Sequence, residues 1–163
     1  AWHTNAPNPG RGTLSIAYGP QYPCCASLGQ FSGTAGSVEL INAVHDEVVS
    51  DLRAAWDPSW PDQGKVTASL GELRPSHNGE MPAILVEVAY HDTLTDANAL
   101  RDPKFRRIAA RAMAQGVARS LGAPFFLVTW AFAALQKAPG AETKGRAPAS
   151  RSSIDGHRQG DDG

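Results

Sequence analysis

The sequence predicts an α/β domain in which a mainly parallel, twisted sheet is flanked by helices. Residues 82–90 form an apolar run interrupted only by Glu87, as expected of a central strand covered on both faces. Residues 37–55 and 103–121 instead repeat their apolar side chains at helical spacing. Strands and helices that alternate along a chain are typical of a parallel sheet.

The first strand is expected at residues 12–18, where apolar and polar side chains alternate loosely. Gly19 and Pro20 end this strand, and a long loop rich in Gly and Pro follows. Cys24 and Cys25 are adjacent in that loop. Because adjacent cysteines rarely bridge each other, we expect two loop thiols and neither a disulfide framework nor a cysteine-rich zinc cluster.

The first helix is predicted over residues 37–55, with Ser37 as its candidate N-cap. The Asp57–Pro58 pair ends it, because a residue before proline disfavours the helical region. A weak strand is expected at residues 66–73. The run at 82–90 is the clearest strand of the chain.

Residues 92–102 are polar and rich in turn formers, and they precede the strongest predicted helix. Asp102 suits the N-cap of that helix and Pro103 its first position. Gly122 stands where a C-terminal cap is expected. The helix is therefore predicted to end near Leu121.

Three parts are expected along the chain. Residues 1–121 carry the folded pattern, residues 122–135 form an apolar extension, and residues 136–163 hold a single large aliphatic side chain, Ile154. A segment this polar buries too little apolar surface to offset its ordering entropy. We therefore predict that the last part is a disordered tail.

The composition excludes two classes of partner. The formal net charge is −1, so no bulk electrostatic attraction draws the chain toward nucleic acid or an anionic membrane. No apolar run reaches the roughly 18 residues that a membrane-spanning helix needs. We expect no nucleic-acid binding, no membrane insertion and no signal peptide within this sequence.

Glu87 and His3 are the candidate chemical groups. A carboxylate in an apolar strand is costly to bury unless it is paired, bound to metal or facing a cleft. Burial would raise its pKa, which suits a general base or acid. A structural glutamate bonded to an arginine or to the backbone explains Glu87 equally well. His3 precedes a loop rich in Asn, Pro and Gly and could bind zinc, although a lone histidine is more often structural or simply exposed.

The other histidines are weaker candidates for metal ligands. His45 lies inside the first predicted helix without the spacing of a His-Glu-x-x-His motif. His77 and His91 lie in predicted turns, and His157 lies in the tail. His91 is the best of these weaker candidates, because it follows the strand that carries Glu87.

Three segments carry a resemblance to a known family. Residues 2–6 read WHTNA and residues 10–13 read GRGT; residues 81–90 read MPAILVEVAY; residues 96–106 read DANALRDPKFR. In this order they resemble motifs of the zinc-dependent N-acetylmuramoyl-L-alanine amidases of the type-3 family. The resemblance covers residues 1 to about 121.

This resemblance implies hydrolysis of the amide bond between N-acetylmuramic acid and L-alanine in peptidoglycan, on a phosphorylase/hydrolase-like fold. By position, His3 corresponds to the last of three zinc ligands and Glu87 to the catalytic glutamate. Zinc with three protein ligands keeps one position open for water and lowers the pKa of that water. The glutamate takes the proton from the water and passes it to the leaving amine.

The chain also departs from the family pattern. The first two zinc ligands, a histidine in a D-P-G-H-G-G turn and a glutamate, would lie upstream of Ala1. Ala89 replaces a frequent glycine, and residues 91–93 replace a turn similar to L-S-N. We therefore expect an N-terminally truncated sheet, the C-terminal portion of the catalytic domain, and an activity that is incomplete in this chain alone.

Two other functions stay open. One is a catalytically incompetent remnant of the fold that binds the cell wall or another protein. The other is a zinc aminopeptidase or carboxypeptidase of related architecture. For the amidase, the implied substrate is a muropeptide, which places the protein in the cell envelope, either periplasmic or secreted.

Overall fold

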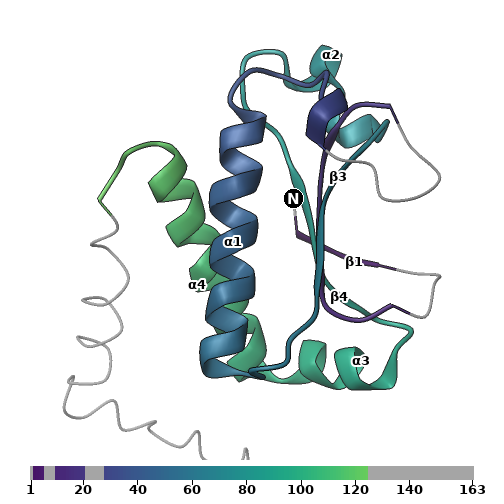
Figure 1. Ribbon diagram of the computed structural model, residues 1–163, viewed down its shortest axis with the longest axis vertical. Coiled ribbons are helices and arrows are strands. Elements are labelled where there is room, and N and C mark those ends of the chain that lie inside the picture. Colours follow the sequence, from purple (N-terminus) through teal and green to yellow (C-terminus); the bar gives the residue numbers. More distant parts are fainter. Residues whose placement is uncertain (1, 6–9, 21–27, 125–163) are drawn as a thin grey trace, which may run out of the picture. The chain divides into compact units, whose positions relative to one another are not determined.

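A computed structural model of the chain describes residues 2–5, 10–20 and 28–124 (Figure 1). These residues all lie in one unit, Ala1–Val128. The predicted tail, nearly all of the apolar extension, and both cysteines lie outside the described residues. The predictions for those segments therefore stay predictions.

Among the described residues the sheet has four strands, and two of its three neighbouring pairs are parallel. The spatial order is β1-β4-β2-β3, with β1 (Trp2–Asn5), β2 (Thr13–Tyr18), β3 (Asp62–Ala68) and β4 (Leu85–Tyr90). β1 runs parallel to β4, and β2 runs parallel to β3. The central pair, β2 and β4, is antiparallel. The α/β class and the mainly parallel sheet are confirmed, and the antiparallel central pair makes the sheet mixed.

Two long helices, α1 (Ser37–Ala55) and α4 (Pro103–Ser120), pack against each other on one side of the sheet (Figure 1). The shorter helices are α2 (Pro75–Asn78) and α3 (Leu94–Arg101), with single turns of 3₁₀ helix at Leu28–Gln30 and Gly71–Leu73. Arg111 pairs with Asp51 and Arg119 pairs with Glu47, so α1 and α4 are also linked by two ion pairs.

The core divides between the two faces of the sheet. The larger cluster lies under α1 and α4 and includes Val86 and Val88 of β4. The smaller cluster joins Leu85 of β4 to Ile16 of β2 and Ala68 of β3. Because side chains alternate along a strand, the odd-numbered positions at the start of β4 face away from the helix pair. All six residues of β4 are buried, as predicted for a central strand.

Of the two predicted N-caps, Asp102 is confirmed and Ser37 is wrong. Asp102 is the N-cap of α4 and its side chain accepts a hydrogen bond from the Lys104 amide, with Pro103 at the first position, as predicted. Ser37 is not the N-cap of α1. Gly36 takes that place in a left-handed conformation, and the Ser37 hydroxyl instead accepts a hydrogen bond from the Ala83 amide.

Three elements differ from the sequence prediction. The weak strand predicted at residues 66–73 is β3, which instead spans Asp62–Ala68, and its register with β2 shifts at the first pair. Residues 94–101, expected to be turns, form α3. β1 was not predicted, because four residues at a sheet edge carry little periodic signal.

Gly116 lets α1 and α4 approach closely. A Cβ atom at this position would lie 2.5 Å from Val44 Cα, which is backbone and cannot rotate away. We expect Gly116→Ala to lower the free energy of unfolding by about 1–3 kcal/mol, the usual cost of overpacking, although alanine favours a helix intrinsically. Urea denaturation measures the change. Gly71→Ala is the control, because nothing lies within 4 Å of its added Cβ; equal effects of the two substitutions would contradict the close contact.

Among the described residues, no helix combines the length and the apolar character that crossing a membrane requires.

Candidate functional site

The two candidate residues occupy opposite register positions on β1 and β4. β1 pairs with β4 in parallel, and the register places His3 opposite Glu87 and Trp2 opposite Val86. Backbones of adjacent strands lie about 4.8 Å apart. The fold therefore brings together two residues that are 84 positions apart in the sequence, 87 minus 3.

Glu87 is the third of the six residues of β4 and is 8% exposed. It lies in the middle of the strand, not at the carboxyl end where ligands of parallel sheets usually bind. By strand alternation it shares the sheet face of Leu85, opposite α1 and α4. Its register partner on the other side is Leu14 of β2. Glu87 thus lies in the interior of the sheet, with His3 at the register position on one side and Leu14 at the position on the other.

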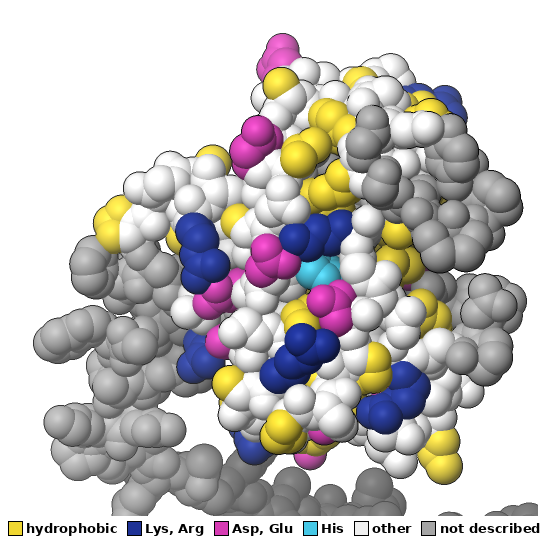
Figure 2. Space-filling view, in the orientation of Figure 1, with side chains coloured by type: hydrophobic (Ala, Val, Ile, Leu, Met, Phe, Trp, Pro, Cys, Tyr) yellow, Lys and Arg dark blue, Asp and Glu magenta, His cyan; other side chains and the backbone are white. Residues whose placement is uncertain are grey.

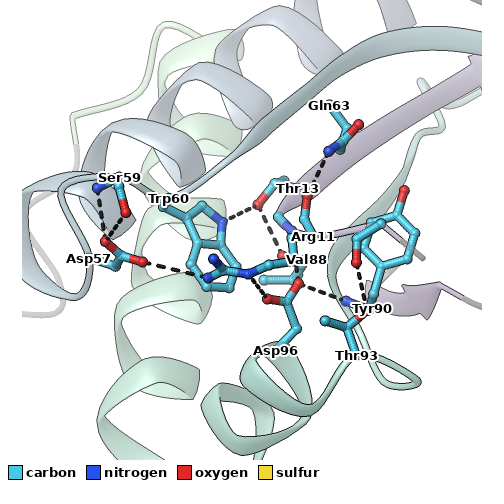
Figure 3. Close-up of polar contacts among 12 residues, drawn as sticks. Arg11, Thr13, Asp57, Ser59, Trp60, Gln63, Val88, Tyr90, Thr93 and Asp96 are labelled. Atoms are coloured by element: carbon cyan, nitrogen blue, oxygen red, sulfur yellow. Dashed lines mark hydrogen bonds and ion pairs between the residues drawn. The ribbon is translucent and has the colours of Figure 1, made fainter.

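Asp96 of α3 contacts both the end of β4 and the segment before β2 (Figure 3). It is fully buried, and its carboxylate accepts hydrogen bonds from Arg11 Nε at 3.0 Å, the Gly12 amide at 2.8 Å and the Tyr90 amide at 3.2 Å. Tyr90 ends β4, and Gly12 lies immediately before β2. One carboxylate therefore fixes the end of β4 to the segment that enters β2.

Two glycines permit this close passage. A Cβ atom at Gly10 would lie 2.6 Å from Tyr90 Cζ, and one at Gly12 would lie 2.0 Å from the carbonyl oxygen of Pro61. Gly12 also has φ of 95°, a conformation that other residues rarely adopt. The Thr93 hydroxyl donates a hydrogen bond to the Gly10 carbonyl at 2.7 Å. The segment 10–12 is thereby held against the end of β4.

Arg11 lies between two carboxylates, as Figure 3 shows. Besides Asp96, it faces Asp57 at 3.6 Å, and its guanidinium lies 5.9 Å from the ring centroid of Trp60. Hydrogen bonds from the Ser59 hydroxyl and amide lower the pKa of Asp57, and Arg11 lowers it further. This arginine joins the segment before β2 to the end of α1 and to α3.

The described histidines do not gather around Glu87. His45 is buried within α1 and bonded to Ser15 and Asp62. His77 is exposed and donates its Nδ1 proton to the Gly71 carbonyl. His91 is exposed directly after β4. Of the histidines placed by the structure, His3 alone lies in register with the glutamate.

The residues that the structure describes do not by themselves fit a catalytic zinc ion. Such an ion takes three protein ligands and an open position for water. Within residues 2–5, 10–20 and 28–124, no group of three or more His, Cys, Asp or Glu side chains is arranged to hold a metal. His3 would supply one ligand, which is too few to hold the ion in a defined position.

Sequence reasoning missed the role of Asp96. It lies in a polar segment that was expected to be turns, yet Asp96 and Ala99 are the buried residues of α3. Their spacing of three is a helical signal, and a carboxylate on the buried side of a helix calls for partners. That pattern could have identified the anchor before the structure did.

The comparisons with known proteins agree on one family. The sequence model of the N-acetylmuramoyl-L-alanine amidases matches residues 2–119. A sporulation-specific N-acetylmuramoyl-L-alanine amidase of Bacillus subtilis strain 168 is 37% identical over 76 residues, which are 47% of this chain and 26% of that protein.

Solved structures give the same fold. An N-acetylmuramoyl-L-alanine amidase from Clostridium difficile 630 aligns with a TM-score of 0.58 and 26% identity, over 74% of this chain and 55% of that one. AmiC2 of Nostoc punctiforme, also an N-acetylmuramoyl-L-alanine amidase, aligns with a TM-score of 0.56 and 18% identity, over 74% and 56%. The chain thus spans about a quarter of the curated relative's length and little more than half of these solved chains.

Proposed function

Since the chain belongs to the N-acetylmuramoyl-L-alanine amidase family, we propose that it carries the proton-transfer part of a peptidoglycan amidase. The bond cleaved is the amide between N-acetylmuramic acid and L-alanine. The observation that carries this proposal is the register of β1 and β4, which sets His3 opposite a buried Glu87. The motif resemblance assigns these two positions to the zinc ligand and the catalytic glutamate.

Glu87 is proposed as the general base and then the general acid. Its carboxylate takes a proton from the attacking water while the water oxygen bonds to the amide carbon. When the carbon–nitrogen bond breaks, the same group gives that proton to the leaving nitrogen. The products are the carboxylic acid on the muramic acid side and a free amine on L-alanine. A buried carboxylate suits this role, because it is shielded from competing water.

Zinc is proposed as the cofactor, with His3 as one ligand. When bound, zinc would polarise the scissile carbonyl and lower the pKa of the attacking water. The further two ligands are expected upstream of Ala1, in the part of the amidase domain that this chain does not span. The complete amidase, in which those ligands are present, is therefore the form we expect to be active.

The substrate class places the protein in the cell envelope. Peptidoglycan strands lie outside the cytoplasmic membrane, so a periplasmic or secreted amidase would reach them. The proposed partner is the muropeptide itself, in which the glycan and the peptide meet at the scissile amide.

Digestion of purified peptidoglycan tests the proposal. We expect the complete amidase to release stem peptides that begin with a free L-alanine amine, identified by mass spectrometry, and we expect a chelator to stop the release. Peptides cut at another amide would favour a zinc peptidase instead. Binding to peptidoglycan with no released peptide would favour a catalytically incompetent wall-binding remnant.

A further inference from the structure

His45 is a fully enclosed histidine whose two ring nitrogens are both engaged. It lies in the middle of α1 and is 1% exposed. Its Nδ1 lies 2.9 Å from the hydroxyl of Ser15 in β2, and its Nε2 lies 2.9 Å from Asp62 Oδ1 at the start of β3. Ser15 is also fully buried. This chain of three side chains, the His45 bridge, ties one helix to two strands.

The partners determine which nitrogen carries the proton. An ionised carboxylate only accepts hydrogen bonds, so Nε2 of His45 must donate to Asp62. Nδ1 of the neutral ring is then an acceptor, and the Ser15 hydroxyl donates to it. A second proton on the ring would make Nδ1 a donor as well. The Ser15 hydroxyl would then have to turn its own hydrogen away inside the core.

The same side of α1 is linked to β3 by charged groups. Lys65 of β3 pairs with Asp46 at 2.6 Å and donates a hydrogen bond to Asn42 at 2.9 Å. Figure 2 shows acidic and basic side chains interspersed on this face of the molecule. The charged groups that act on His45 are thus Asp62 and Lys65 from β3 and Asp46 from α1. The bridge is the buried member of this set of contacts.

We propose that the His45 bridge is an acid-sensitive latch, which holds α1 and β3 against β2 while His45 is neutral and loosens when the ring is protonated. β2 is the strand next to β4, and Ser15 is adjacent to Leu14, the register partner of Glu87. Loosening the latch therefore affects the strand that borders the candidate site.

The direction of the pH effect follows from burial. Burial lowers the pKa of His45 below its ordinary value near 6.5, and the hydrogen bond to Asp62 offsets only part of that shift. Above about pH 6.5 the ring is neutral in both folded and unfolded chains. Below it, the unfolded chain takes up a proton that the folded chain does not, so stability falls until the pH reaches the folded-state pKa.

Asp62 adds a second, more acidic step. Burial raises the pKa of Asp62, but hydrogen bonds from His45 and the Gly64 amide outweigh this, so its pKa is lowered. The stability that Asp62 contributes is therefore present above its ordinary pKa near 3.8 and is lost below it. The window between about pH 6.5 and pH 5 isolates the histidine step.

The test combines two measurements on the full chain. Proton NMR of the His45 ring is expected to show it titrating at lower pH in the folded chain than in the chain unfolded in urea. Urea denaturation between pH 7.5 and 5.0 is expected to show the folding equilibrium constant falling by up to about tenfold per pH unit below pH 6.5. His45→Gln should remove this fall, because glutamine can donate and accept hydrogen bonds but does not titrate.

The matched control is His77→Gln, which removes an exposed histidine and should leave the fall unchanged. The proposal is overturned when His45 titrates in the folded chain at or above the pH at which it titrates in the unfolded chain, or when His45→Gln shows the same pH dependence as the unsubstituted chain. If the glutamine variant does not fold, the titration of His45 in the folded and unfolded states of the unsubstituted chain decides by itself.

Discussion

Replacing Glu87 by glutamine is expected to slow release of stem peptides by the complete amidase about 100- to 10,000-fold, the usual contribution of a positioned general base. Glutamine has nearly the same volume and can still accept hydrogen bonds, but it cannot take the proton from water. Because Glu87 lies in the interior of β4, a shape-preserving substitution separates the chemical role from packing. The released amine is measured under saturating substrate.

Glu80→Gln is the matched control, since Glu80 is exposed and precedes the same strand. It should leave the rate unchanged. Far-ultraviolet circular dichroism should show that Glu87→Gln keeps the secondary structure of the parent. A folded Glu87→Gln variant that works at the parent rate would remove the proton-transfer role from this residue and leave it as a structural glutamate.

Replacing Asp96 by alanine is expected to lower the free energy of unfolding by about 3–5 kcal/mol, because two buried backbone amides and a partly buried arginine lose a charged acceptor. Three donors lose their acceptor at once: Arg11 Nε and the amides of Gly12 and Tyr90. Since domains of this size are stable by only about 5–15 kcal/mol, a large share of the stability would be lost. Urea denaturation at neutral pH measures the loss.

Asp92→Ala supplies the comparison for Asp96→Ala. Asp92 is an exposed aspartate in the turn between β4 and α3, and exposed substitutions of this kind usually change stability by less than about 0.5 kcal/mol. Asp96→Asn should fall between the two, because its amide keeps one accepting oxygen. Similar losses for Asp96→Ala and Asp92→Ala would show that the anchor is not needed for the fold.

The strongest local signals in the sequence predicted their elements correctly. An apolar run identified β4, and periodic apolar positions identified α1 and α4. Asp102 and Pro103 also marked the start of α4 correctly, because capping depends on neighbouring residues alone. These features are decided within a few residues, so no knowledge of the rest of the chain is needed.

Features that depend on distant residues were missed. The antiparallel pairing of β2 with β4 and the edge position of β1 depend on strand order, which no local pattern encodes. Ser37 satisfies a distant amide at Ala83 and so does not cap its own helix. Only the family resemblance linked His3 to Glu87 before the structure, because the two paired strands that carry them are far apart in the sequence.

The central claim is that the β1–β4 pair carries the reaction centre, and locating zinc tests it most directly. Crystals of the complete amidase grown with zinc would be measured on both sides of the zinc absorption edge. The account predicts an anomalous peak at a bonding distance of about 2.0–2.1 Å from a ring nitrogen of His3. His3 lies on β1, opposite Glu87 of β4. Zinc bound at other residues, with no peak at His3, would contradict it.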